Sequence, residues 1–207
     1  MAISRGGGGP VNRAPVIETE AWRRIRLKGT WTAVPTLSWT AAVTGSGATA
    51  QGPSYGEINT GTTTGSTSRL YTGLFLLGGA DGIDFSKRIL WGFNVRRAIS
   101  DAALIARFQL KAANTEGALA AGGLGLRAAN LTLTGESYNS AGAFTGTIQA
   151  MTSAVTYAIL IDHEPSVPRT RFYVNGVLQA TVTASTNIPQ AAVSNCLMIM
   201  SILNGAG

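Results

Sequence analysis

The sequence predicts an all-β protein, a two-sheet antiparallel sandwich of jelly-roll type preceded by an extended N-terminal arm. The chain of 207 residues contains 26 glycines and only 13% charged residues, whereas about 25% charged residues is usual in a globular domain. Short segments of alternating polar and apolar residues follow one another at regular intervals, with turn signals between them. This pattern is typical of β-sandwiches. The sequence contains no internal repeat of the length that would indicate a solenoid.

Residues 1–20 are expected to form the arm and residues 21–207 the sandwich. Four consecutive glycines and two prolines in the arm oppose a regular helix. Residues 1–30 hold six basic and two acidic side chains, so +4 of the net charge of +6 lies there. A basic arm can bind nucleic acid, but without a dense basic run we expect docking on an acidic protein neighbour. The arm residues expected to bind that partner are Arg5, Arg13, Trp22, Arg23, Arg24 and Arg26.

In the N-terminal half, strands are expected over residues 22–28, 36–44, 69–77, 88–97 and 104–111. The strand over residues 88–97 places Trp91, Phe93 and Val95 on one face, and the strand over residues 104–111 alternates in the same way. Residues 45–68 are rich in Gly, Ser and Thr and are expected to form a long surface loop with a short strand near Tyr55. A short helical turn is expected over residues 99–105, since Ser100 or Asp101 can cap it.

In the C-terminal half, strands are expected over residues 124–127, 130–134, 144–150, 156–163 and 195–203. Asn175-Gly176, between two β-rich runs, is the strongest hairpin signal, because a type I′ turn needs positive φ at both central positions. The last strand is apolar enough for the centre of a sheet. The predicted core residues are Trp91, Phe93, Ile159, Ile161, Phe172, Val174, Leu197 and Ile199.

Four motifs follow one another in the C-terminal third: Tyr157 to Asp162, Arg171 to Gly176, Asn187 to Pro189 and Ile199 to Gly207. With the strand around Trp91, they resemble the concanavalin A-like lectin/glucanase and laminin-G-like sandwiches, above all those of bacteriophage virion proteins. The resemblance covers residues 69–207 and implies the fold more than the function, because these sandwiches host many functions. It also implies a further strand after the last motif, which would be lost here or supplied by a neighbour or the arm.

The stretch from Leu160 to Glu164 partly resembles the Glu-x-Asp-x-Glu signature of sandwich-fold glucanases. Those enzymes use two carboxylates, one as nucleophile and one as acid/base. Leu160 stands at the nucleophile position, so we expect no catalytic activity. Asp162 and Glu164 are expected to begin a turn before Pro165, and His163 to be a surface or turn residue rather than a member of a catalytic triad.

No cofactor and no metal site is expected. One cysteine, Cys196, and one histidine exclude a Cys/His zinc cluster, and Cys196 is expected to be a buried thiol. Asp81 and Asp84 are expected to form a tight turn rather than a calcium loop, and residues 122–125 lack the spacing of a nucleotide-binding loop. No apolar run approaches the ~18 residues that span a bilayer, so no membrane partner is expected.

Aromatic residues provide a second set of candidates, because aromatic rings can stack on sugars but more often pack in the core or at interfaces. These candidates are Trp31, Trp39, Tyr55 and Tyr71. The expected function is that of a bacteriophage virion structural protein, a capsid decoration or cement protein held on the major capsid protein or other virion subunits. It is expected to be a homo-oligomer located in the virion. The alternative is a carbohydrate-binding module for host adsorption on a tail, fibre or head surface.

Overall fold

The computed structural model describes residues 40–52, 55–60, 63–73, 82–97, 103–111, 119, 122–194 and 197–205. This part of the chain consists mainly of antiparallel strands, with one short 3-10 turn at Ser185–Asn187 and no α-helix. The prediction of an all-β chain is therefore confirmed. Within the same residues, no helix has the length and apolar character needed to cross a membrane.

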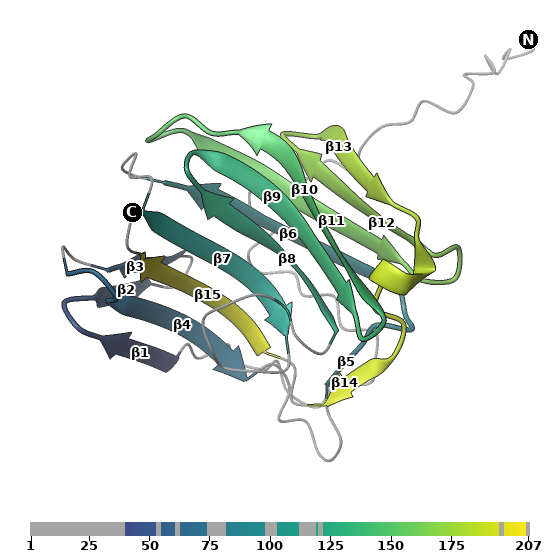
Figure 1. Cartoon of the computed structure of the whole chain (residues 1–207), viewed down its shortest axis with the longest axis horizontal. Coiled ribbons are helices and arrows are strands. Elements are labelled where there is room, and N and C mark those ends of the chain that lie inside the picture. The colour runs from purple at the N-terminus through teal and green to yellow at the C-terminus, as the bar shows by residue number, and fades with distance from the viewer. Residues whose placement is uncertain are drawn as a thin grey trace, which may run out of the picture.

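The larger sheet has seven strands in the order β1-β4-β15-β7-β8-β9-β10 (Figure 1). Every neighbouring pair is antiparallel. The bounds of its strands are β1 (Thr40–Thr44), β4 (Thr67–Gly73), β15 (Leu197–Asn204), β7 (Leu104–Lys111), β8 (Gly123–Ala129), β9 (Thr132–Asn139) and β10 (Gly142–Ala150).

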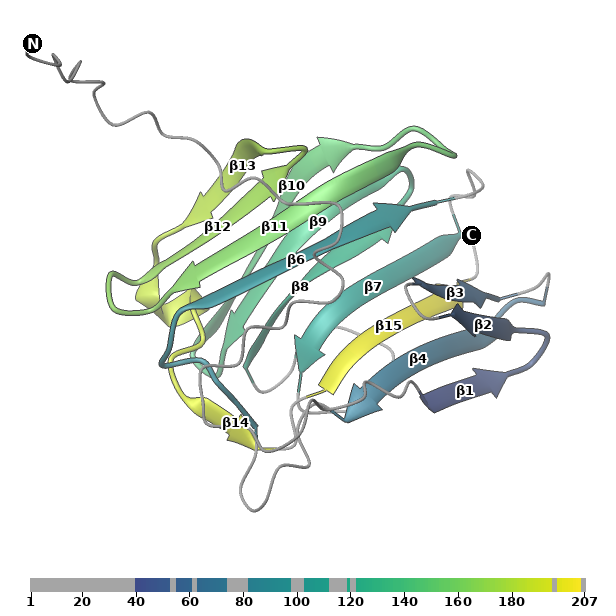
Figure 2. The same cartoon turned by 180° about the vertical axis from the view of Figure 1, so that it is seen from behind.

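The smaller sheet has four strands in the order β13-β12-β11-β6 and lies against the larger one, as Figure 2 shows from behind. Its strands are β13 (Val177–Val182), β12 (Arg169–Val174), β11 (Thr156–Glu164) and β6 (Ile89–Arg96). Two further antiparallel pairs are β2 (Ala48–Gly52) with β3 (Tyr55–Asn59), and β5 (Gly82–Asp84) with β14 (Ala192–Ser194). The predicted two-sheet sandwich is confirmed.

The core lies between the two sheets and contains most of the residues predicted for it. Phe93, Ile159, Ile161, Phe172 and Val174 are buried there, and Trp91 packs against them half-buried. The alternation of β6 and β11 explains this, since every second side chain of a strand points to the same face.

The side chains of β15 that face the core differ from those predicted. Met198 packs against the core, whereas Ile199 is buried on the opposite face of the sheet, beside Gln109 of β7. The side chain of Leu197 is outside the described residues. Because both faces of this strand are covered with apolar residues, its sequence alone does not reveal which face meets the core.

Turns explain the other differences from the predicted elements. Asn175 and Gly176 have φ of 50° and 79° and close the predicted hairpin between β12 and β13. Asn130 and Leu131, at φ of 45° and 54°, form a turn where the sequence predicted strand. Leucine rarely adopts positive φ, so the sequence Asn130-Leu131 did not indicate this turn.

Three further expectations are revised in part. The short strand predicted near Tyr55 is present as β3, but residues 45–68 also contain β2, which forms a hairpin with it. Ser68 of β4 donates a hydrogen bond to the Asn59 carbonyl of β3, 2.5 Å away. Strand β7 begins at Leu104, as predicted for the strand, so the expected helical turn does not extend to residue 105; residues 99–102 lie outside the described residues. The last strand, β15, pairs on both sides within this chain, with β4 and β7, so the further strand that the resemblance implies has no place beside it. The strand expected over residues 22–28 lies outside the described residues.

Candidate functional site

Most of the predicted binding residues cannot be placed. Tyr71 lies half-buried on β4, beside Ile199 of β15, on the face of the larger sheet that points away from the smaller sheet. Tyr55 belongs to β3, but its side chain is outside the description. The candidates that lie wholly outside the described residues are Arg5, Arg13, Trp22, Arg23, Arg24, Arg26, Trp31 and Trp39.

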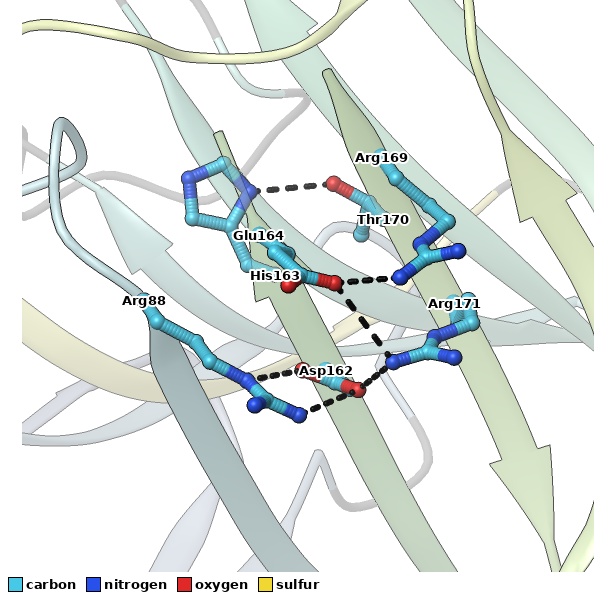
Figure 3. A network of polar contacts seen from close by, with 7 residues as sticks. All are labelled: Arg88, Asp162, His163, Glu164, Arg169, Thr170 and Arg171. Carbon is cyan, nitrogen blue, oxygen red and sulfur yellow. Dashed lines mark hydrogen bonds and ion pairs between the residues drawn. The ribbon is translucent and has the colours of Figure 1, made fainter. Parts of the chain in front are cut away.

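The glucanase-like stretch lies on β11, where successive residues alternate between the two faces. Asp162 and Glu164 point away from the core, whereas His163 points into it (Figure 3). The expected turn does not begin at Asp162, because the strand continues to Glu164 and pairs there with Arg169 of β12. Neighbours in sequence on opposite faces cannot form the Asp-His pair of a catalytic triad.

Two arginines donate hydrogen bonds to the carboxylate of Asp162, whose side chain is only 5% exposed. Arg88 donates from Nε to Oδ1 at 3.0 Å and from Nη2 to Oδ2 at 3.1 Å, a bidentate arrangement. Arg171 Nη2, from the neighbouring strand β12, donates to Oδ2 as well. The Asp162 hydrogen bonds and charge raise the pKa of Arg88. A buried carboxylate without such partners would be strongly unfavourable.

Glu164 forms the second ion pair of this network (Figure 3). Arg169 Nη2 donates to its Oε2, and Arg171 Nη2 lies 3.8 Å from the same oxygen. The hydrogen bond from Arg169 is the main cause that holds the pKa of Glu164 below its usual range. A general acid in glycoside hydrolysis needs a carboxyl pKa raised toward neutrality. The environment of Glu164 acts in the opposite direction.

His163 is fully buried, so the expectation of a surface or turn position is wrong. Its Nε2 lies 2.9 Å from the Phe85 carbonyl oxygen and its Nδ1 lies 3.0 Å from Thr170 Oγ1. Since a carbonyl only accepts, Nε2 carries the proton and Nδ1 accepts from the threonine hydroxyl. Burial lowers the pKa of this histidine. Pro165 suggested a turn, but it follows the last strand residue rather than interrupting the strand.

Asp84 forms the tight turn that the sequence predicted. Its Oδ1 accepts a hydrogen bond from the Ser86 backbone N–H at 2.9 Å, and its carbonyl accepts from the Lys87 N–H at 3.1 Å. The hydrogen bonds from Ser86 lower the pKa of Asp84. Asp81 and Cys196 lie outside the described residues. Within the described residues, no group of three or more His, Cys, Asp or Glu side chains could hold a metal ion.

A row of polar side chains crosses the face of the larger sheet that points away from the core, which we call the outer face. Ala106, Phe108 and Leu110 of β7 contact the core, so the residues between them, Arg107 and Gln109, belong to the outer face. The strand register aligns one row across five strands: Arg69, Ser201, Arg107, Arg127 and Thr134.

Arg107 and Arg127 are directly opposite each other on β7 and β8. Both side chains are half-buried, and the Nε atom of each is buried without a hydrogen-bond partner. Within the described part of the chain, neither guanidinium has an ion-pair partner. Burial is the main cause that lowers the pKa of Arg107. The Glu136 carboxylate raises this pKa, and the positive charge of Arg127 lowers it further.

The next row contains a buried polar pair. Gln109 Nε2 donates to Glu136 Oε2 at 2.7 Å, across Gly125 of β8. Because a carboxylate only accepts, the amide nitrogen must face Glu136, and Gln109 Oε1 is left buried without a partner. A Cβ at Gly125 would lie 2.6 Å from the Phe108 carbonyl oxygen and 2.8 Å from Gln109 Cγ. Glycine is therefore required for this approach.

Sequence reasoning missed this outer face. Its arginines come from β4, β7 and β8 and become neighbours only through strand register. The one available signal was the polar phase of residues 104–111, in which Arg107, Gln109 and Lys111 alternate with apolar residues. That phase identifies an outward face, but not the strands that complete it.

Comparisons with known proteins establish the fold. No family model matches the chain, and no curated protein matches it in sequence. The solved β-glucanase of Bacillus licheniformis is similar, with 16% identity and a TM-score of 0.51, over 85% of this chain and 83% of that chain. The carbohydrate recognition domain of Emp46p in its potassium-bound form has 10% identity and a TM-score of 0.52, over 82% of each chain. The chain thus has a concanavalin A-like sandwich fold.

Proposed function

We propose that the protein acts by association rather than catalysis, as a structural component that decorates or cements a bacteriophage capsid. One observation supports association above all: Asp162 and Glu164, the carboxylates of the glucanase-like stretch, are both engaged by arginines. Leu160 stands where the nucleophile of such an enzyme would be. The resemblance of the C-terminal motifs to virion sandwiches supports the phage particle as the setting.

The partner in this proposal is the major capsid protein or another virion subunit. The arm and the basic residues that follow it are the attachment segment, because residues 1–30 carry +4 of the net charge of +6 and the remainder of the chain is nearly neutral. Arginine and aromatic residues such as those of the arm are also enriched at protein interfaces. Since the arm lies outside the described residues, this assignment rests on its sequence.

Deletion of residues 1–20 tests the attachment. We expect the truncated protein to keep its unfolding transition, because the strands in the described part of the chain begin at Thr40. We also expect it to be lost from particles. The measurement is the copy number per purified particle, for the full-length protein and the truncated variant expressed side by side. Equal incorporation of the truncated variant would contradict the proposal, as would absence of the full-length protein from particles.

A second function is carbohydrate binding at the particle surface, which would serve adsorption to the host. The observation that favours it is the outer face, where the charges of Arg107 and Arg127 and the acceptor of Gln109 lack partners. Buried polar atoms in native proteins are nearly always paired. The Nε atoms of Arg169 and Arg171 on the smaller sheet also lack hydrogen-bond partners, but those guanidinium groups are ion-paired, whereas Arg107 and Arg127 are not within the described part of the chain. Emp46p, whose similar domain is called a carbohydrate recognition domain, makes a glycan a reasonable ligand class.

A further inference from the structure

We propose that residues 22–28 add a strand to the smaller sheet by pairing with the open edge of β6, with Ile25 and Leu27 facing the core. This inference goes beyond the capsid role and does not depend on it. Three features support it: an incomplete cover over part of the larger sheet, an uncharged open edge next to it, and the side-chain pattern of the segment.

The core side of the larger sheet is covered unevenly. On β8, the core-facing side chains of Leu124, Leu126 and Ala128 are at most 2% exposed. On β4, Leu70 is fully buried, and the β2–β3 hairpin contacts this strand. Between them lies a half-buried strip of core-facing side chains, in the middle of β7 and on β15. Its members are Ala106, Phe108, Met198, Met200 and Ile202.

Strand β6 borders this half-buried strip with an open edge. It is the last strand of the smaller sheet on the side of the β2–β3 hairpin (Figure 2), and among the described strands it pairs with β11 alone. Phe93 of β6 stacks on Phe108 of the strip, with ring centroids 5.6 Å apart. The eight residues of β6 include one charged residue, Arg96 at its end. Native proteins usually cover such an edge, because its unpaired N–H and C=O groups can pair with another chain.

The segment over residues 22–28 has the pattern that this position requires. Ile25 and Leu27 alternate with three basic residues, Arg24, Arg26 and Lys28, so a strand here is apolar on one face and charged on the other. Beside β6, the apolar face would cover the half-buried strip, and burial of apolar surface would stabilise the pairing. The basic face would remain in water and give the sheet a charged edge, which opposes aggregation.

The chain is long enough to bring this segment to β6. The described part begins at Thr40 of β1, and β7, over which β6 packs, is three strands from β1 in the larger sheet. That separation is ~14 Å across the sheet, with ~10 Å between the layers. Residues 29–39 span up to ~36 Å when extended. A tethered segment also has a millimolar effective concentration, which favours it over a second copy of the chain.

Hydrogen exchange of the β6 amides in the full-length protein tests the inference. In an antiparallel strand, backbone N–H groups point alternately to the two neighbouring strands, so half of the β6 amides point to the open side. We expect these open-side amides to be protected in the full-length protein and to exchange at least tenfold faster in a variant that lacks residues 1–30. A variant that lacks only residues 1–20 is the control and should keep the protection.

Two substitutions test which face of the segment meets the core. Leu27→Ser and Arg26→Ser introduce the same side chain at neighbouring positions on opposite faces. Leu27→Ser should accelerate exchange of the open-side amides at least tenfold, because it removes buried apolar surface, whereas Arg26→Ser should change it less than twofold. These variants keep the test decisive if the variant without residues 1–30 fails to fold.

Four outcomes would overturn the inference: unprotected open-side amides in the full-length protein, equal protection without residues 1–30, equal effects of the two substitutions, or protection that falls on dilution. The last would assign the edge of β6 to a second copy of the chain. Exchange is measured on the isolated protein, so this inference and the capsid role fail separately.

Discussion

Among single residues, His163 shows how a polar side chain is accommodated in this core. Its imidazole joins β11 to two other segments, through the Phe85 carbonyl and the Thr170 hydroxyl. Its ring also contacts Phe85 edge-on, with centroids 5.9 Å apart. In the neutral ring Nε2–H donates to the carbonyl and Nδ1 accepts from the hydroxyl, whereas protonation would place a charge in the buried core. The residue therefore has a structural role that depends on its protonation state.

The fold should lose stability as the pH falls below about 6.5, the ordinary pKa of histidine. Burial lowers the pKa of His163 in the folded state, so the unfolded chain binds the proton more readily and protonation favours unfolding. The loss can reach ~1.4 kcal/mol per pH unit until the folded-state pKa is passed. Denaturant unfolding at pH 7.5, 6.5 and 5.5 measures it.

A His163→Gln variant supplies the control for this prediction. It should be less stable than the wild type at pH 7.5, since the ring contact is lost, but its stability should change little between pH 7.5 and 5.5. The chain contains one histidine, so no other histidine contributes to the slope. An unchanged slope in the variant would assign the pH dependence to other groups.

Among the elements, β8 determines how the outer face is built. Leu124, Leu126 and Ala128 fill the core side of this strand, while the outer side carries Gly125 and Arg127. The glycine leaves room for Gln109 to reach Glu136 on the far neighbour. The absence of a side chain at Gly125 therefore explains the hydrogen bond between Gln109 and Glu136 across β8.

Gly125→Ala should destabilise the protein by about 1–3 kcal/mol, the usual cost of overpacking. Its Cβ would lie 2.6 Å from a backbone oxygen that cannot turn aside. Gly92→Ala on β6 is the matched control, because the nearest atom to its Cβ is the Ile159 carbonyl oxygen at 3.7 Å. That variant should change stability by less than ~0.5 kcal/mol. Equal effects of the two substitutions on the free energy of unfolding would refute the close approach.

Strands could be predicted from the sequence where one face is apolar and the other polar, as in β6 and β12. The hairpin at Asn175-Gly176 could be predicted because positive φ has a residue signature. Turns without that signature could not, as at Asn130-Leu131. The outer face could be predicted least, since Arg107 and Arg127 meet only through pairing of β7 with β8. Register depends on tertiary packing as well as on local sequence.

In the whole molecule, the two outer surfaces of the sandwich differ in their electrostatics. On the smaller sheet, Asp162 and Glu164 are matched by arginines from β12 and by Arg88, which directly precedes β6. On the larger sheet, Arg107 and Arg127 have no such match in the described part of the chain. The smaller sheet therefore has an outer surface on which these carboxylates are already paired.

The central claim is that the protein associates and does not hydrolyse. The most direct test is the release of reducing ends from neutral and acidic polysaccharides by the purified full-length protein, with Asp162→Asn and Glu164→Gln variants assayed in parallel. We predict no release above the buffer background for any of the three proteins. Release by the wild type that either substitution abolishes would contradict the claim and make the ion-paired carboxylates of β11 a catalytic pair.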